Sequence, residues 1–540
     1  MSGDILIAYD VGTTSLKTCV YRLGGQLELI AGAMSEYDLE ITDGGCAEQN
    51  PDDWFRAMVD TTQRVLKEPG VDAADVAGIS FCSQMQGLVL VDRGGRALRP
   101  AMSYMDGRAS AQKNRCGSLK GRAPAGIKIE GVPIDKVLRS VQITGIAPLS
   151  VKDPLWKYHW VREHEPEIFA EVYKYLDVKE YLIMRLTGRA VMTPDSACAT
   201  FMYDNRPGRG EWSRAVCRMY GMNPDHLAPI IDSTDSAGPL LGEIAAEMGL
   251  AAGVPVFGGG GDASLIGIGA GATEENDAHV YMGTSGWVSA LTSKRRLDLQ
   301  HKIASITGAV PSKFQYFCEQ ETAGKCMEWV AKHLALDEIG VYLEKKKISD
   351  DPETVYSNLF EYMSEVISQT EAGCGGVLFT PWLHGSRSPF EDPDARGMFF
   401  NIGLNTGKRK LIRAVIEGLS YNLKWMLESV EAGMPCNETI RFVGGGAQSD
   451  VNAQILADVL GRTIEVPESP QNSGALGAAI TAAIGLGKIA SFEEVKPRIK
   501  IKKVFKPQTA DSDVYERNYS VFTKLYQANK NFFRELNRSC

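Results

Sequence analysis

The chain has 540 residues, enough for two large α/β domains, and its hydrophobic fraction of 44% and charged fraction of 23% are those of a globular protein. A formal net charge of −9 argues against nucleic acid as the main ligand, and no apolar run reaches membrane-spanning length. Because the eleven cysteines are dispersed without a Cys-x-x-Cys pair and no secretory signal is evident, we expect a cytoplasmic protein with reduced thiols.

The first predicted elements are a buried strand at 5–10, a turn at 12–15 and a second strand at 16–21. The turn reads Gly-Thr-Thr-Ser, so it offers backbone N–H groups and hydroxyls that suit a phosphate. Asp10 ends the first strand, where it is placed to orient a hydrated cation. An ordinary hairpin turn explains this stretch alone equally well.

A helix at 51–66 and a strand at 77–82 are predicted next, and the strand leads into a Gln-Met-Gln-Gly segment at 84–87. Residues 109–150 are basic, interrupted by glycine and proline, and weakly periodic, which predicts an excursion on the surface. Two further helices are predicted, at 154–164 and 178–186.

A predicted strand at 255–257 runs into four glycines at 258–261, and Asp262 follows them directly. A carboxylate at a strand end projects into a cleft, and beside a polyphosphate it can accept a proton from an attacking hydroxyl. The alternative is that Asp262 caps the helix that begins at Ala263, and the two roles are compatible. The Gly-x-Gly-x-x-Ala pattern at 267–272 resembles a dinucleotide fingerprint, but it continues the helix, which favours small-residue helix packing.

A second strand–turn–strand unit at 279–292 repeats the first, with Gly-Thr-Ser-Gly at 283–286. The two Gly-Thr turns lie about half a chain length apart, which indicates two related domains that each carry a phosphate loop. A third glycine-rich turn at 444–446 leads into Ala-Gln-Ser at 447–449 and suits the ribose or phosphate of a nucleotide. A tight strand-to-helix turn is the alternative here, and the sequence contains no Walker P-loop motif.

The second half continues the alternation of strands and helices that is typical of an α/β protein. A charged run at 344–351 is predicted to be a solvated loop. Strands are expected at 377–379 and 439–443, and helices at 324–334, 411–430, 452–460, 473–484 and 515–536.

In order and spacing, these motifs resemble the FGGY family of carbohydrate kinases, within the actin/sugar-kinase/Hsp70 superfamily. The resemblance covers nearly the whole chain and is nearest to the xylulokinase branch. It implies an α/β fold of two ribonuclease-H-like domains with a cleft between them, 1–272 for sugar binding and catalysis and 273–540 for the nucleotide. It rests on the segments Asp10–Lys17, Gln84–Gly87, Asp106–Arg108, Pro154–His164, Gly259–Asp262, Gly283–Gly286, Arg413–Gly418 and Gly444–Ala447.

The same resemblance implies ATP-dependent phosphorylation of a sugar hydroxyl, with Asp262 as general base and Mg²⁺ held by Asp10 and Asp262. Sugar and ATP would be the partners, with neither nucleic acid nor membrane. The sugar contacts it implies are Gln84, Met85, Gln86, Asp106, Arg108 and Asp262. The nucleotide contacts it implies are Gly12, Thr13, Thr14, Lys17, Gly283, Thr284, Gly445, Gly446, Ala447, Gln448 and Asn452.

The expected substrate is a ketopentose such as D-xylulose, but two residues depart from the xylulokinase pattern. Gln86 stands where the branch usually has His, and Tyr104 stands where it usually has Trp. Another ketose, a polyol or a sugar acid therefore stays open as the substrate. The segment 109–150 is longer than the family leads us to expect, and it either covers the cleft or forms a contact within a homodimer.

Two readings from other classes also stay open. One is an ATP-driven machine of the same superfamily, which would have no evident use for Gln84, Asp106 and Arg108. The other is a sugar- and ATP-binding regulatory protein without catalysis, against which the presence of both Asp10 and Asp262 argues.

Overall fold

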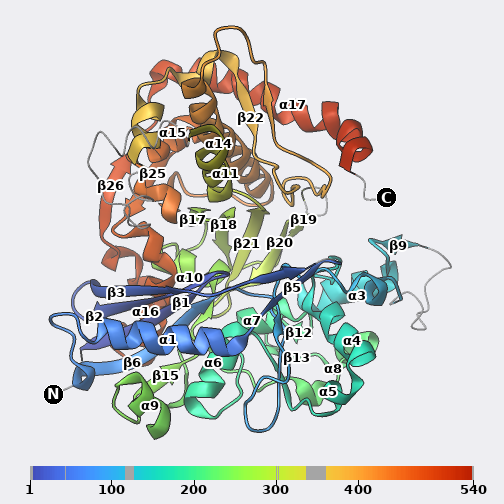
Figure 1. Ribbon diagram of the computed structural model, residues 1–540, viewed down its shortest axis with the longest axis vertical. Helices are drawn as coiled ribbons and strands as arrows, with labels where there is room; N and C mark the ends of the chain where they lie inside the picture. The colour runs from blue at the N-terminus through green and yellow to red at the C-terminus, as the bar shows by residue number, and fades with distance from the viewer. Residues whose placement is uncertain are drawn as a thin grey trace.

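The computed structural model describes residues 4–42, 44–115, 127–298, 301, 303–335 and 361–537, so the predicted loop at 344–351 lies outside the described residues. Figure 1 shows two lobes stacked along the long axis, the N-terminal half forming the lower lobe and most of the C-terminal half forming the upper one. Within the parts of the chain that the structure describes, no helix is both long and apolar enough to cross a membrane.

A seven-stranded sheet forms the centre of the lower lobe. Strand β1 is antiparallel to β2 and parallel to β6, and its apolar residues are fully buried between the helices on the two faces. The strands predicted at 5–10, 16–21, 77–82 and 255–257 are all confirmed. In the order β14-β15-β6-β1-β2-β3 with β16 beside β6, the strands are Ser236–Pro239, Pro255–Phe257, Val76–Ser83, Ile5–Val11, Ser15–Arg22, Glu28–Glu36 and Gly260–Gly261.

An eight-stranded sheet forms the centre of the upper lobe and repeats this pattern. Strand β17 is antiparallel to β18 and parallel to β24, as β1 is to β2 and β6, which agrees with the repeat predicted from the two Gly-Thr turns. In the order β19-β20-β21-β18-β17-β24-β25-β26, the strands are Leu297–Asp298, Ile303–Thr307, Phe314–Gln320, Gly286–Thr292, Ala278–Met282, Thr439–Val443, Thr463–Pro467 and Ile501–Phe505.

Helices of the lower lobe begin and end where local sequence signals place them. Helix α1 has proline at its first position, and the Asn50 side chain accepts a hydrogen bond from the Asp52 N–H, while α6 ends at Gly188 in the left-handed conformation. These helices are α1 (Pro51–Val65), α2 (Ser110–Arg115), α3 (Ile134–Thr144), α4 (Pro154–His164), α5 (Pro166–Ala170), α6 (Val178–Thr187), α7 (Pro194–Ala199), α8 (Arg214–Tyr220) and α9 (Gly242–Met248).

Short strands complete the lower lobe and add one pair to the upper one. They form the sheet β4-β5-β8 and the pairs β7–β11, β9–β10, β12–β13 and β22–β23. Their bounds are Glu40–Thr42, Cys46–Gln49 and Ala101–Met102, then Val89–Val91 with Lys174–Leu176, Lys128–Ile129 with Val132–Pro133, Tyr203–Asp204 with Glu211–Trp212, and Leu378–Thr380 with Met398–Phe400.

In the part that the structure describes, the segment 109–150 has more regular secondary structure than the predicted surface excursion. Its described part contains α2, the β9–β10 hairpin and α3, and α3 buries Val137 and Ile143. The guanidinium of Arg295 in the upper lobe donates to the backbone carbonyl oxygen of Val141. The segment therefore belongs to the lower lobe and contacts the upper one.

Two helices lie where the lobes meet: α10 (Asp262–Gly269) and α16 (Ser473–Gly485). A Cβ on Gly269 would lie 1.9 Å from the Ser473 backbone oxygen, and a Cβ on Gly477 would lie 2.1 Å from that of Leu265. This confirms small-residue helix packing at Gly269, where α10 ends, while residues 270–272 lie beyond the helix. Helix α16 also packs on β1 and β6, so a late part of the sequence completes the core of the lower lobe.

The predicted helices of the upper lobe are confirmed, most of them extended by one to three residues at an end. The expected helix at 324–334 is divided, because α11 changes after Val330 into a π-helical stretch, Ala331–Ala335. The helices are α11 (Gly324–Val330), α14 (Lys408–Gly433), α15 (Asp450–Leu460) and α17 (Ser512–Asn537).

Candidate active site

A cavity of about 1760 Å³ opens between the lobes, and both lobes contribute to its lining. It collects residues from distant parts of the sequence that were predicted to form one site. The predicted residues that line it are Asp10, Gly12, Thr13, Thr14, Lys17, Gln84, Met85, Gln86, Asp262, Gly283, Thr284, Gly445, Gly446, Gln448 and Asn452.

The first Gly-Thr loop is the tight connection between β1 and β2. Its conformation is held from inside the lobe, because the Gln49 side chain donates to the Thr13 carbonyl at 2.7 Å. The Thr13 hydroxyl lies 3.4 Å from the Tyr104 hydroxyl. The Lys17 ammonium donates to the backbone oxygen of Gln471 at 2.9 Å, so it reaches the segment that leads into α16.

Asp262 is the first residue of α10, and Gly261 is the N-cap, so the helix begins one residue earlier than predicted. The carboxylate accepts a hydrogen bond from the Ala263 N–H at 2.8 Å. Burial raises the pKa of Asp262 to about 8, and the nearby charge of Asp10 adds to the increase. Burial also raises the pKa of Asp10, although Lys17 opposes that increase. Such shifted carboxyl groups in a cavity are typical of functional sites.

The Asp10 and Asp262 pair has the chemistry that Mg²⁺ requires. Magnesium is usually held by one or two carboxylates together with waters and phosphate oxygens rather than by a complete protein cage. Among the described residues, no cluster of three or more His, Cys, Asp or Glu offers a complete protein cage for a metal.

The second Gly-Thr loop connects β17 to β18 and faces the same cavity. A Cβ on Gly283 would lie 2.0 Å from the Tyr281 hydroxyl oxygen, so only glycine fits above that ring. The Gly324 N–H donates to the Gly283 carbonyl at 2.7 Å, which brings the start of α11 behind the loop. Lys325 follows at once and lines the cavity.

The third glycine-rich turn follows β24 and leads into α15. Asn452 lies on α15, and its side chain donates to the Gly446 carbonyl at 3.2 Å. Ala447 is the one predicted nucleotide contact that lies outside the lining of the cavity. Its side chain is buried in the hydrophobic core of the upper lobe and does not line the cavity, because the turn directs it inward.

The Gln-Met-Gln segment lies against the residue that precedes Asp262. Gln84 is buried and donates to the Gln49 side chain at 2.9 Å. A Cβ on Gly261 would lie 2.1 Å from the Met85 sulfur, so the Met85 side chain packs directly on the Gly261 backbone. The structure therefore brings the predicted sugar side and the predicted base together.

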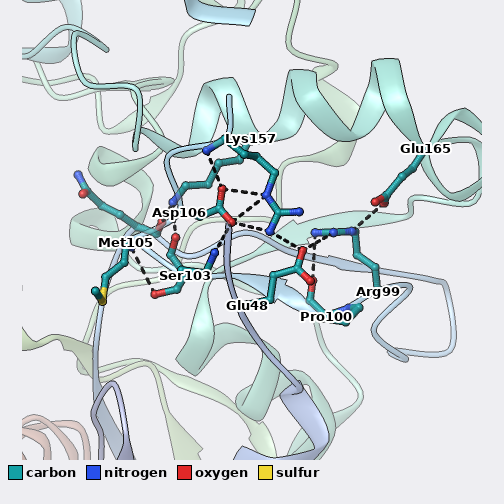
Figure 2. A network of polar contacts seen from close by, with 11 residues as sticks. Glu48, Arg99, Pro100, Ser103, Met105, Asp106, Lys157 and Glu165 are labelled. Carbon is teal, nitrogen blue, oxygen red and sulfur yellow. Dashed lines mark hydrogen bonds and ion pairs between the residues drawn. The ribbon is translucent and has the colours of Figure 1, made fainter. Parts of the chain in front are cut away.

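Asp106 and Arg108 lie outside the lining of the cavity, which corrects their predicted place. Asp106 is fully buried and accepts hydrogen bonds from the Ala47 N–H at 2.8 Å and the Arg108 guanidinium at 2.6 Å. Figure 2 shows how Glu48 and Arg99 extend this network as far as Glu165. With both carboxylate oxygens engaged, Asp106 stabilises the turn that carries Tyr104.

Tyr104, which departs from the xylulokinase pattern, lines the cavity, and so do Glu319 and Arg387, which were not predicted. Glu319 is on β21, and the Arg387 guanidinium donates to its carboxylate at 2.7 Å. Arg387 also lies 3.5 Å from Glu321, which is 4.0 Å from the Lys152 ammonium of the lower lobe. Glu319 is the single charged residue of β21, which was the available signal for it.

Comparison with known proteins identifies this arrangement. Residues 5–269 match the N-terminal domain model of the FGGY family of carbohydrate kinases, and residues 278–486 match its C-terminal domain model. This chain belongs to the FGGY family of carbohydrate kinases. The match to both models confirms the family inferred from the motifs, and with it the assignment as an enzyme that phosphorylates a sugar with ATP.

Individual FGGY relatives resemble the chain over its whole length. A xylulose kinase of Staphylococcus epidermidis is 30% identical over 99% of this chain and 99% of its own. A gluconokinase of Bacillus subtilis is 28% identical over 98% of this chain and 97% of its own. The solved structure of a ligand-bound xylulose kinase from Lactobacillus acidophilus has a TM-score of 0.82 at 22% identity, covering 98% of this chain and 99% of that one, and supports the fold.

Proposed function

We propose that this FGGY family member transfers the γ-phosphoryl group of ATP to a terminal hydroxyl of a ketose, with D-xylulose as the first candidate. The observation that supports this most directly is the position of Asp262, at the head of α10 in the same cavity as both Gly-Thr loops and Gln84–Gln86. Xylulose kinases are prominent among the relatives at full-length coverage.

The proposed mechanism gives each part of the cavity one task. Asp262 accepts the proton of the attacking hydroxyl, because its carboxylate lies at the head of α10 and lines the cavity. The two loops and Lys17 hold the terminal phosphates in line with that hydroxyl. When bound at Asp10 and Asp262, Mg²⁺ would neutralise charge on the phosphates. Gly445, Gly446, Gln448 and Asn452 would contact the nucleotide.

The charges of the cavity favour a neutral ketose over a sugar acid. A carboxylate substrate needs an unpaired cation, but Arg387, near the sugar side, is already paired with Glu319 and Glu321. The other cations among the described lining residues are Lys17 and Lys325, on or directly behind the phosphate loops, and Arg56, which is paired with Asp53. A sugar carboxylate would instead meet Glu319 and Asp262.

Gluconate is the second candidate, because a gluconokinase matches the chain at similar coverage. We would measure ADP formation with D-xylulose, D-ribulose, glycerol and D-gluconate at equal concentrations. The expected result is the highest kcat/KM for D-xylulose and the lowest for gluconate. A preference for gluconate would contradict the charge argument, and the absence of sugar-dependent ADP formation would contradict the proposed function.

The assignment of the base predicts the behaviour of Asp262→Asn. Because the amide cannot accept the proton, kcat should fall by about 10²–10⁴-fold while ATP still binds. Steady-state kinetics and calorimetry with ATP measure the two effects. Asp235→Asn is a control, since Asp235 is exposed in the same lobe and only caps a turn. Retention of more than about a hundredth of the wild-type kcat would contradict the role of base.

A further inference from the structure

Asp177 is a buried carboxylate that collects backbone N–H groups from two separate segments. It is only 2% exposed and stands directly before α6. One oxygen accepts from the Val178 N–H at 2.9 Å, which is an ordinary helix cap. That same oxygen accepts from the Gly87 N–H at 2.9 Å, and the other accepts from the Gln86 N–H at 2.8 Å. Capping α6 requires only the first of these bonds.

The segment that Asp177 holds is in an unfavourable backbone conformation. Gln86 has φ of 64°, a region that side chains other than glycine rarely adopt. Such a conformation persists only where the surrounding structure fixes it. Gly87 is required as well, because a Cβ there would lie 2.8 Å from the Asp177 carboxylate.

A second buried charge holds Gln86 from the opposite side. The Lys157 ammonium, on α4, donates to the Gln86 carbonyl at 3.1 Å and to the Ser103 carbonyl at 2.6 Å. The N–H and the carbonyl of Gln86 are therefore both bonded to charged side chains that do not line the cavity. Bonds of this charge-assisted kind are stronger than those between neutral groups.

We propose that Asp177 is a positioning residue for the sugar, acting through Gln86 and Gly87. The inference rests on the proposed function, and it deepens it by naming what preforms the sugar side of the site. With both ends of the Gln86 residue fixed, Gln84, Met85 and Gln86 present one surface beside Asp262 before any ligand arrives. A surface that is already ordered loses little conformational entropy when the sugar binds, so the sugar binds more tightly.

The position of Asp177 predicts which ligand will bind more weakly when its hydrogen bonds to Gln86 and Gly87 are removed. The phosphate loops are carried by the β1–β2 and β17–β18 turns, and none of the hydrogen bonds of Asp177 reaches them. Loosening Gln86 should therefore weaken sugar binding and leave nucleotide binding as it was. A general loss of folding would affect both ligands alike.

The test is Asp177→Asn, which preserves size but leaves one acceptor oxygen and turns an NH₂ group toward a backbone N–H. We expect the KM for the sugar substrate to rise by about tenfold or more, with the KM for ATP within about twofold of wild type. The matched control is Asp392→Asn. Asp392 is 3% exposed and accepts from the Asp394 N–H and the Tyr526 hydroxyl, both at 2.9 Å, in the upper lobe.

The control should lower thermal stability without changing the KM for sugar. If Asp177→Asn does not fold, Gly87→Ala tests the same contact, because its methyl group displaces the carboxylate without removing its charge. An unchanged sugar KM in the soluble variant, or an equal rise of both KM values, overturns the proposal. Either outcome contradicts only the role of Asp177. The proposed function is contradicted separately, if the wild-type enzyme does not phosphorylate the sugar.

Discussion

At the scale of single residues, His279 shows how burial makes stability depend on pH. It is 1% exposed on β17, and the Trp287 indole N–H donates to its Nε2 atom at 3.0 Å. Burial lowers the pKa of His279 to about 4, from the ordinary value of 6.5. Between these two values the unfolded chain takes up a proton that the folded protein cannot bind, so stability falls as pH falls.

His279→Gln should remove this part of the pH dependence, because glutamine accepts the indole N–H and does not titrate. The shift corresponds to a loss of up to about 3 kcal/mol for the wild type between pH 7 and pH 4. Urea unfolding at a series of pH values measures it. We expect a shallower decline in the variant, and parallel curves for the two proteins would contradict the assignment.

Residues whose role is set by local sequence could be predicted, and those whose role is set by distant packing could not. The Gly-Thr turns and Asp262 were recognisable because a turn and a strand end are local features. The pair of Glu319 and Arg387 joins side chains 68 residues apart. The motif that contains Asp106 does not indicate which way its side chain points. Only the packed structure shows that the carboxylate is buried.

At the scale of elements, α10 and α16 are held together by close backbone approach. A glycine inside a helix usually costs stability relative to alanine, but at Gly477 a side chain would have no room. Helices α10 and α16 were predicted from their small residues, whereas α3 was missed because glycine and basic residues around it obscured its apolar spacing. The spacing of apolar residues predicts a helix only where the flanking residues do not interrupt the pattern.

Gly269→Ala should destabilise the protein by about 3 kcal/mol or more, since the new methyl group would overlap the Ser473 backbone oxygen, which cannot move without shifting a helix. Equilibrium unfolding in denaturant measures the change. Gly242→Ala is the matched control, because Gly242 starts α9 and its Cβ would come no closer than 3.9 Å to Ala252. Equal stabilities of the two variants would contradict this account of the packing.

At the scale of the whole molecule, the cavity has room for two ligands and is bounded by two lobes. Its volume of about 1760 Å³ exceeds that of an ordinary small-molecule pocket. The sugar hydroxyl and the γ-phosphorus must approach to roughly 3–3.5 Å. Groups carried by different lobes reach that distance reliably when the lobes close, and closure would also exclude water.

Sugar together with a non-hydrolysable ATP analogue should therefore give a smaller radius of gyration than the protein alone, as measured by small-angle scattering. If both ligands favour the closed state, each should also tighten the binding of the other, which calorimetry can detect. Each ligand alone is the control. An identical radius in all samples, with independent affinities, would mean that the site is already closed.

The position of α16 has a consequence for how the protein is made. The apolar side chains of Leu6, Ala8 and Cys19 pack against Ala475 and Ala478 of α16, and the strands that carry them leave the ribosome first. At about 5–20 residues per second, the roughly 400 residues that separate β6 from α16 take about 20–80 s to synthesise. For that time one face of the sheet in the nascent lower lobe lacks its covering helix, which makes the unfinished chain prone to aggregation.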